Sequence, residues 1–150
     1  MTDLHMPTLR QADTGDWSKI RALLLESGLP VDDLAAEKLD GFLVAEDGSE
    51  LVGLIGLQLF DTIGLLRSLV VASKARRLGL GSKLVGALES AAQAAGVTEL
   101  WLLTIDAEKF FERYGFDIVT RDTAPSSIRE TDEFRDLCPG TAFLMRKILA

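Results

Sequence analysis

The segment from Leu69 to Lys83, LVVASKARRLGLGSK, constrains the fold of this chain more than any other. An apolar strand pattern runs into a turn that contains two glycines, and the turn opens a long helical pattern. Gly79 and Gly81 have no side chains, so a ligand can approach the backbone closely there. The first N–H groups of a helix lack internal partners and lie at the positive end of its dipole. The segment therefore predicts an anion site where the strand meets the helix.

Charge makes this turn distinctive. The 150 residues carry a net charge of −7, which argues against a general nucleic-acid binder because phosphate backbones need a broad basic surface. Four basic residues nevertheless surround this one turn: Lys74, Arg76, Arg77 and Lys83. A local basic patch on an acidic chain is well suited to a pyrophosphate.

The rare residue types exclude several kinds of chemistry. His5 is the only histidine and Cys138 the only cysteine, which removes Ser-His-Asp hydrolysis, zinc thiol clusters and most transition-metal sites. We expect no metal. The apolar stretch from Leu51 to Phe60 is interrupted by two glycines and a glutamine, and a membrane-spanning helix needs about twice its length. The N-terminus shows no signal pattern, so we expect a cytoplasmic protein with no membrane partner.

The order of the patterns predicts a mixed sheet with helices on its faces. Asp16 is expected to cap the first helix, and Asp47-Gly48 to form a hairpin turn. Strands are expected at residues 8–12, 42–46, 51–59, 65–72, 99–104, 115–120 and 141–148. Helices are expected at residues 17–27, 32–39, 79–95, 107–114 and 131–137.

The glycine-containing turn fits neither of two common phosphate-binding motifs. A P-loop needs a lysine directly after its second glycine, but Lys83 follows Ser82, and no glycine stands where the first one belongs. The dinucleotide fingerprint would need a glycine where Leu84 stands. The turn does match R-x-x-G-x-G, with Arg76, Gly79 and Gly81 after a strand that ends at Val71. It resembles the pyrophosphate-binding signature of the GCN5-related N-acetyltransferase (GNAT) superfamily.

A second segment strengthens the resemblance. Thr104 to Phe116, TIDAEKFFERYGF, resembles the second motif of the family, in which a strand leads to a short helix that carries aromatics. The resemblance implies one GNAT domain over residues 1–150, of α/β (α+β) class. Its sheet would be mixed and mostly antiparallel, with six or seven strands, helices on both faces and two splayed central strands.

The resemblance also implies acetyl-CoA as the acetyl donor, with its pantetheine arm between the strands at 65–72 and 99–104. The residues that it assigns to the cofactor are Leu69, Val70, Val71, Arg76, Arg77, Leu78, Gly79, Leu80, Gly81, Ser82, Thr104, Phe110, Phe111 and Arg113.

The chemistry that the resemblance implies is direct attack of a neutral amine on the thioester, often with a tyrosine that protonates the leaving thiolate. This sequence departs from the pattern, because Phe111 occupies the usual tyrosine position. Tyr114 is the candidate acid, although a packing role is favoured on geometry. Ser68 is the second catalytic candidate. The strand offers no carboxylate base, so a route through water stays open.

Arg67 interrupts an apolar strand, where a charge is costly unless it has an anionic partner. Two readings are evenly weighed: an ion pair with an internal acid, and a contact with a substrate carboxylate. In the second reading Arg67 and Ser68 bind the substrate, which is a small-molecule amine of amino-acid type. A bidentate arginine suits a carboxylate, a phosphinate or an arsonate equally. Alternation predicts that the two side chains point to opposite faces.

The tail from Ala124 to Met145, APSSIRETDEFRDLCPGTAFLM, resembles that of bacterial N-acetyltransferases associated with arsenic resistance. The resemblance admits an arsenic-containing amino-acid analogue as the acceptor. It also implies that four residues lie near the acceptor site: Arg129, Thr131, Glu133 and Cys138. Two ordinary alternatives remain. Thr131 caps a helix, and Cys138 is a small buried hydrophobe, which is the favoured interpretation for the cysteine.

Three functions therefore compete. The first is a small-molecule N-acetyltransferase, which is ranked highest. The second is an acetyl-CoA-binding regulatory module without turnover, favoured by Phe111 and the missing base. The third is acetylation of a protein or peptide. A homodimer is a mild expectation under each of them.

Overall fold

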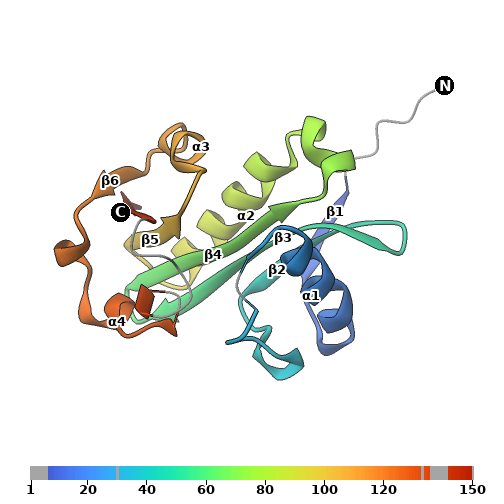
Figure 1. Cartoon of the computed structure of the whole chain (residues 1–150), viewed down its shortest axis with the longest axis horizontal. Helices are drawn as coiled ribbons and strands as arrows, with labels where there is room; N and C mark the ends of the chain where they lie inside the picture. Colours follow the sequence, from blue (N-terminus) through green and yellow to red (C-terminus); the bar gives the residue numbers. More distant parts are fainter. Residues whose placement is uncertain (1–6, 30, 133, 136–141, 150) are drawn as a thin grey trace. The chain divides into compact units, whose positions relative to one another are not determined.

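The computed structural model describes residues 7–29, 31–132, 134–135 and 142–149 (Figure 1). Its seven described strands form one sheet in the order β1-β2-β3-β4-β5-β7-β6. The strands are β1 (Thr8–Gln11), β2 (Phe42–Asp47), β3 (Glu50–Phe60), β4 (Ile63–Val71), β5 (Glu99–Thr104), β6 (Asp117–Val119) and β7 (Phe143–Ile148). The α-helices are α1 (Trp17–Glu26), α2 (Leu80–Ala94), α3 (Glu108–Glu112) and α4 (Ser126–Arg129). Four short 3-10 helices are η1 (Thr14–Asp16), η2 (Ala36–Lys38), η3 (Ser73–Leu78) and η4 (Arg121–Thr123).

Strand pairing confirms the predicted sheet class. The pairs β1–β2, β2–β3, β5–β7 and β6–β7 are antiparallel, whereas β4 and β5 are parallel. The parallel register covers three residue pairs and ends at Leu65 and Trp101, although both strands continue. The two strands therefore part after a short stretch of pairing, as expected.

The chain divides into two compact units, which are described separately. The N-terminal unit comprises Met1–Leu57 and Ser68–Ala91, and the C-terminal unit comprises Gln58–Arg67 and Ala92–Ala150. Strands β3 and β4 and helix α2 each contribute residues to both units. That residues 1–150 form a single GNAT domain stays a prediction.

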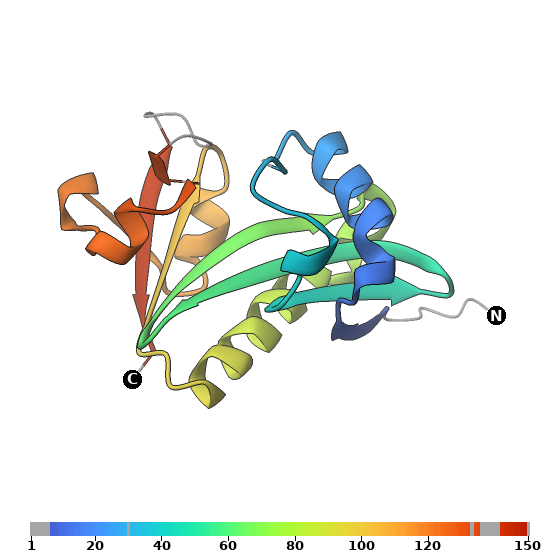
Figure 2. The ribbon, with the colours of Figure 1, turned by 90° about the horizontal axis from the view of Figure 1, so that it is seen from below.

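In the N-terminal unit, helices cover both faces of the strands, and Figure 2 shows α1 (blue) and α2 (yellow-green) on opposite sides of β2 and β3. The reason is the alternation of side chains along β3. A Cβ built on Gly53 would lie 3.1 Å from atoms of Leu80 and Leu84, so α2 packs directly on this glycine. The next residue, Leu54, is fully buried on the other face, in a cluster with Ile20 of α1.

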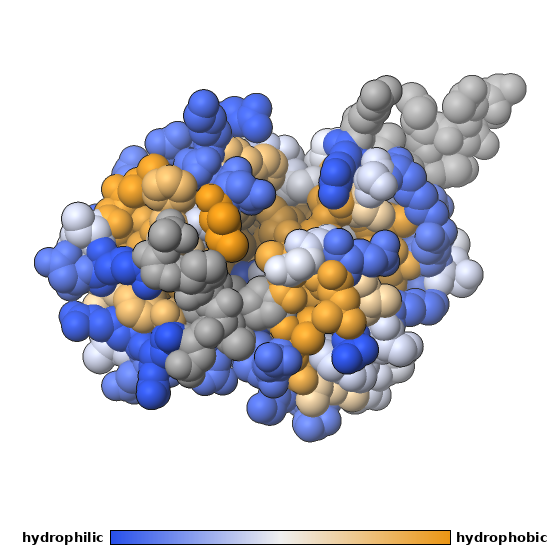
Figure 3. Space-filling view, viewed as in Figure 1, coloured by the Kyte–Doolittle hydropathy of each residue, from blue (hydrophilic) through white to orange (hydrophobic). Residues whose placement is uncertain are grey.

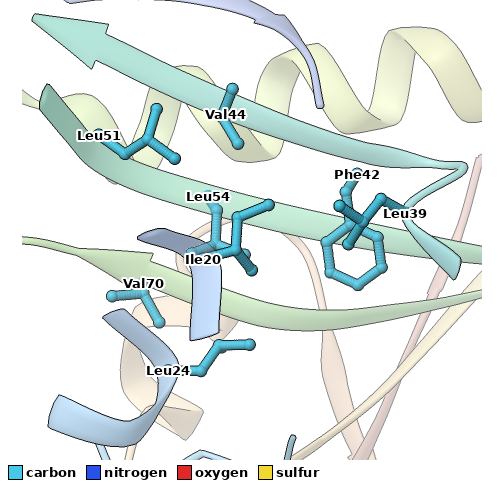
Figure 4. Close-up of a cluster of buried hydrophobic side chains, with 8 residues drawn as sticks. All are labelled: Ile20, Leu24, Leu39, Phe42, Val44, Leu51, Leu54 and Val70. Carbon is cyan, nitrogen blue, oxygen red and sulfur yellow. The ribbon is translucent and has the colours of Figure 1, made fainter. Parts of the chain in front are cut away.

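That cluster is the core under α1. Figure 4 shows Ile20 and Leu24 from the helix beside Leu54 and Val70 from the strands. The other members are Leu39, Phe42, Val44 and Leu51. Each fully buried Leu or Ile side chain contributes about 1.5–3 kcal/mol to folding, so this apolar layer fixes how α1 packs on the strands. Figure 3 shows apolar surface over the region of α1, where Leu25 is half exposed.

In the C-terminal unit, β5 is paired along its whole length with β7, from Glu99 opposite Ile148 to Thr104 opposite Phe143. A second core cluster lies on one face of these strands. It contains Leu65, Trp101, Ala124, Ile128 and Leu144, with Phe60, Ile63, Leu103, Val119 and Phe134 packed around it. Helix α4, at Ser126–Arg129, was not predicted from the sequence, and it brings Ile128 into the cluster.

Several local predictions need correction. Asp16 stands at the N-cap position of α1, but its carboxylate makes no capping hydrogen bond to that helix. It accepts instead from the backbone N–H of Asp13 and from Arg10. The helix expected at 32–39 is reduced to η2, and the strand at 115–120 to Asp117–Val119. The helix expected at 131–137 and the strand start at 141 fall partly outside the described residues.

Ser68 interrupts β4. Its φ of 60° lies in the left-handed region, which non-glycine residues rarely occupy within a strand. Alternation cannot be carried through a residue with this backbone, so the predicted opposite orientation of Arg67 and Ser68 does not follow. Both side chains are buried, with exposures of 2% and 7%.

None of the helices in the described part of the chain has the length and apolar character needed to cross a bilayer.

Candidate functional site

The predicted anion segment lies in the N-terminal unit, at the junction of β4, η3 and α2. Gly79 ends η3 with φ 70° and ψ 23°, and the fifteen-residue α2 begins at the next residue. A Cβ on Gly79 would meet no atom within 4 Å, so the backbone conformation and not space requires glycine here. The residue is exposed, which leaves the start of α2 open to an anion.

The basic side chains of this segment are held in two different ways. Arg76 folds back on the end of β4, where its Nε donates to the Val71 carbonyl at 3.1 Å. The Nζ of Lys74 pairs with the Glu50 carboxylate on β3, which offsets its charge. The side chains of Arg77 and Leu78 lie outside those that the structure describes. Among the described basic side chains of the predicted patch, two are not paired with a carboxylate: Arg76 and the exposed Lys83.

The apolar residues around this junction differ in what they offer a ligand. Val70 and Leu80 are buried, with exposures of 5% and 0%, so their side chains belong to the core and only their backbone groups are available. Leu69, Val71, Gly81 and Ser82 are half-buried. Backbone N–H groups are therefore the main donors that this junction can present.

The second predicted segment lies in the C-terminal unit and is organised around aromatic rings. Thr104 ends β5, and its Oγ1 accepts the N–H of Ala107 at 3.0 Å, just before α3. The Phe110 ring centroid lies 5.1 Å from that of Phe111 and 5.0 Å from that of Tyr114. Ring pairs at these distances stabilise one another beyond simple burial.

Phe111 and Arg113 occupy contrasting positions in this segment. Phe111 is 4% exposed and its ring packs edge-on against Phe116 at 5.6 Å, so it fills the core beneath α3. The Arg113 guanidinium is exposed and lies 5.9 Å from the centre of the Phe110 ring. Cation–π contact at this distance steadies an exposed arginine. A hydroxyl is thus missing at the position of Phe111, while Tyr114 is half-buried beside Phe110.

Arg67 and Ser68 are the buried polar residues of β4. The strand brings the arginine into an apolar setting, two residues after the core residue Leu65. A buried guanidinium is retained only where its charge is balanced, within the protein or by a ligand. The left-handed backbone of Ser68 is a strained conformation, and such strain is concentrated at functional sites.

The predicted tail residues divide into two groups. The Arg129 Nε donates to the Ala124 carbonyl at 2.9 Å, which ties the guanidinium to the loop before α4. Thr131 accepts the N–H of Phe134 at 3.2 Å and donates to the Ile128 carbonyl at 2.7 Å. These bonds agree with the capping role for Thr131. Glu133 and Cys138 lie outside the described residues.

Gln58 is not among the site residues that the sequence predicts, but its environment is unusual. It lies in β3, and its Oε1 is buried with no hydrogen-bond partner among the residues that the structure describes. The only sequence signal was a glutamine in an otherwise apolar stretch, which is too common to single out one residue. No cluster of three or more His, Cys, Asp or Glu residues able to hold a metal occurs in the described ranges.

Comparison with known proteins agrees with these two segments. Residues 6–116 match the family model described as Acetyltransferase (GNAT) family. The amino-acid acetyltransferase of Neisseria meningitidis serogroup A is 25% identical over 149 residues, covering 94% of this chain and 34% of that protein. The chain thus spans about a third of the length of this curated relative.

Solved structures show the same fold. N-acetylglutamate synthase from Neisseria gonorrhoeae, complexed with coenzyme A and N-acetyl-glutamate, matches with a TM-score of 0.84 at 22% identity, covering 99% of this chain and 36% of that one. Rv2747 from Mycobacterium tuberculosis, in complex with CoA, matches with a TM-score of 0.78 at 23% identity, covering 96% and 100%. With a family match over more than half of its residues, the chain belongs to the GNAT family of acetyltransferases.

Proposed function

We propose that this protein is an acetyl-CoA-dependent N-acetyltransferase whose acceptor is a small amine that carries a carboxylate. The family match supports the acetyl transfer. The observation that carries the choice of acceptor is the guanidinium of Arg67, 2% exposed in β4 and directly before the strained Ser68. An arginine fork binds a carboxylate through two parallel hydrogen bonds, which gives both charge balance and orientation.

The N-terminal unit fits the pyrophosphate of the donor. Gly79 leaves the start of α2 uncovered, and the N–H groups from Gly79 to Ser82 are the donors that would hold the phosphate oxygens. Arg76, anchored on the Val71 carbonyl, adds a positive charge at the same turn. Acetyl-CoA supplies an acetyl thioester when bound. The remaining predicted contacts, at Leu69–Val71, Thr104, Phe110 and Arg113, belong to the same proposal.

The acceptor must reach the reaction as a neutral amine, and β4 presents no carboxylate that removes its proton. We therefore assign proton loss to water. In this proposal Ser68, which is buried and follows Arg67 in β4, orients the acceptor by a hydrogen bond. Arg129 and Glu133 remain predicted substrate contacts. The Arg129 guanidinium already donates to its own loop, so we expect it to contribute less to substrate binding than Arg67 does.

Two relatives support an acceptor of amino-acid type. One is named amino-acid acetyltransferase, and the other was solved with N-acetyl-glutamate. The tail resemblance extends the proposal to acceptors in which an arsenic-containing group replaces one acid of the amino acid. Such a group presents the oxygens of an arginine-binding anion, so Arg67 suits it as well.

The test is release of free thiol from acetyl-CoA in the presence of a panel of amines. The panel contains all the amino acids, their decarboxylated counterparts, and phosphinic and arsenical analogues of glutamate. Turnover confined to amines with a carboxylate or a matching oxyanion supports the proposal. Turnover of the decarboxylated amines at equal rates contradicts the assignment of Arg67.

A second candidate is a regulatory module that binds acetyl-CoA without turnover. Phe111 favours it, because a buried ring stands where a tyrosine acid is usual and brings no hydroxyl. This alternative predicts cofactor binding with no thiol release for the whole panel. Basic peptides added to the same assay test for a peptide acceptor, which would be identified by thiol release that depends on the peptide.

The predicted cytoplasmic location and homodimer are part of the proposal as well. Cell fractionation tests the first, and sedimentation equilibrium of the purified chain tests the second.

A further inference from the structure

Gln58 is a polar side chain in the apolar strand β3. The residues before it in the strand, from Leu51 to Leu57, are all buried, and the amide oxygen of Gln58 is itself inaccessible to solvent. Within the described part of the chain, this Oε1 has no hydrogen-bond partner. Buried acceptors are almost always satisfied in folded proteins, so an exception calls for a ligand or for a functional reason.

The face on which Gln58 lies follows from its neighbours. Phe60, two residues further along β3, packs against the core cluster of Leu65 and Trp101. Side chains two residues apart in a strand share a face, so Gln58 lies on the same side of the sheet as this cluster. Arg67 stands two residues after Leu65 in β4, with no left-handed residue between them, and shares that face too.

The hairpin connection brings the two polar residues near each other. Strands β3 and β4 are neighbours in the sheet and are joined by the two turn residues Asp61 and Thr62. In a hairpin with a two-residue turn, Gln58 on β3 is directly opposite Leu65 on β4. Arg67, two residues beyond Leu65, is then a diagonal cross-strand neighbour of Gln58. Diagonal neighbours lie about 7–8 Å apart, within reach of long side chains. The guanidinium and the amide oxygen are therefore near enough for one small ligand to span them.

We propose that the Oε1 of Gln58 accepts an N–H of the acceptor amine whose carboxylate Arg67 holds. The inference rests on the proposed function and adds a residue that determines specificity at the same site. A neutral primary amine has two N–H groups and one lone pair. One N–H donated to Gln58 leaves the lone pair free for the carbonyl carbon of the thioester, so the residue both binds and aims the acceptor.

Gln58→Met is the main test, because the side chain keeps its length and loses the amide oxygen. We expect kcat/KM for the carboxylate-bearing acceptor to fall about tenfold to a hundredfold, the range for removing one partner of a buried hydrogen bond. The KM for acetyl-CoA should change less than twofold. The melting temperature should stay equal or rise, because an unsatisfied buried group is removed.

Leu59→Met is the matched control. Leu59 is the next residue in β3, points to the other face and is 53% exposed, so the same new side chain should leave acceptor kinetics unchanged. Gln58→Leu is a second variant that repeats the test with a branched side chain. A lower melting temperature together with weaker binding of both substrates would mean a structural role and would overturn the inference.

The two proposals fail in different ways. If the wild type acetylates carboxylate-bearing amines and Gln58→Met keeps kcat/KM within twofold, only the role of Gln58 is wrong. If the wild type acetylates none of the amines, the proposed function falls and the inference falls with it.

Discussion

Arg10 and Asp16 form a two-pronged ion pair, in which Nη1 and Nη2 of the arginine each lie 2.8 Å from one oxygen of the carboxylate. Arg10 comes from β1 and also donates from Nε to Glu46 on β2 at 3.2 Å. Asp16 Oδ2 accepts the N–H of Asp13 as well. The network thus joins β1, η1 and β2. The hydrogen bond from Arg10 lowers the pKa of Asp16, against the opposing effect of burial.

We predict that Asp16→Asn lowers the free energy of unfolding by about 1–3 kcal/mol at pH 7, the range for hydrogen bonds to charged groups. A carboxyl whose pKa is lowered on folding stabilises the protein above its unfolded pKa and loses that contribution as pH falls through the folded pKa. The difference between wild type and variant should therefore shrink below about pH 4. Urea unfolding at pH 7 and pH 3 measures it.

The control for this prediction is Glu26→Gln, which removes an exposed carboxylate at the end of α1. It should change stability by less than about 0.5 kcal/mol at either pH. An Asp16→Asn effect that is constant between pH 7 and pH 3 would show that charge pairing is not its source.

Gly79 and Gly48 offer a matched pair of variants for the anion site. Both are exposed, with φ of 70° and 65°, and a Cβ on either would meet no atom within 4 Å. Alanine at each position should therefore cost about 1 kcal/mol of stability through backbone strain alone. Gly79→Trp should weaken acetyl-CoA binding at least tenfold, whereas Gly48→Trp at the β2–β3 hairpin should not. Calorimetric titration with acetyl-CoA compares them, and equal affinities would place the pyrophosphate elsewhere.

Regular patterns in the sequence were enough to predict most of the sheet. The strand at Glu99–Thr104 has the predicted bounds, because an apolar run between a Gly-containing turn and a polar loop has few alternatives. The hairpin at Gly48 was predictable from one Asp-Gly pair, which favours a tight turn. A glycine-containing turn before the long helix was also predicted, although the helix begins at Leu80 and not at Gly79. The structure adds a second reason for glycine there, because its φ of 70° is strained for other residues.

Other features depend on contacts that the sequence does not reveal. Asp16 has the residue type and position of an N-cap, but Arg10 and the Asp13 N–H occupy its oxygens. The left-handed φ of Ser68 could not be predicted, because serine rarely adopts this backbone conformation and carries no local signal for it. The unsatisfied oxygen of Gln58 becomes visible only when the burial of every neighbouring atom is known.

Arg67 can be tested by comparing pairs of acceptors. We predict that Arg67→Met lowers kcat/KM at least tenfold for an amino acid that the wild type accepts, because the carboxylate loses a bidentate partner. The decarboxylated counterpart of the same amino acid should be much less affected. The ratio of the two values is the measurement, since a general loss of folded enzyme cancels from it. Equal losses for both acceptors would favour the internal ion pair over substrate binding.

Two roles of Tyr114, packing in the aromatic cluster and protonation of the leaving thiolate, can be distinguished by mutation. Its ring lies 5.0 Å from Phe110 at an interplanar angle of 50°, so the aromatic contact survives in Tyr114→Phe. A general acid contributes on the order of 10²–10⁴ to a rate. Because a thiolate is a good leaving group on its own and the ring packs within the aromatic cluster, we predict that kcat of Tyr114→Phe stays within twofold of the wild type.

The comparison variant is Tyr114→Ala, which removes the ring as well. It should lower the melting temperature, since an aromatic pair contributes about 0.5–1.5 kcal/mol beyond burial. Steady-state kinetics of the two variants distinguishes the two roles. A hundredfold fall in kcat in Tyr114→Phe, with the melting temperature unchanged, would instead assign the phenol as the acid. In that case the general acid would stand at Tyr114, three residues after the position that the buried Phe111 occupies.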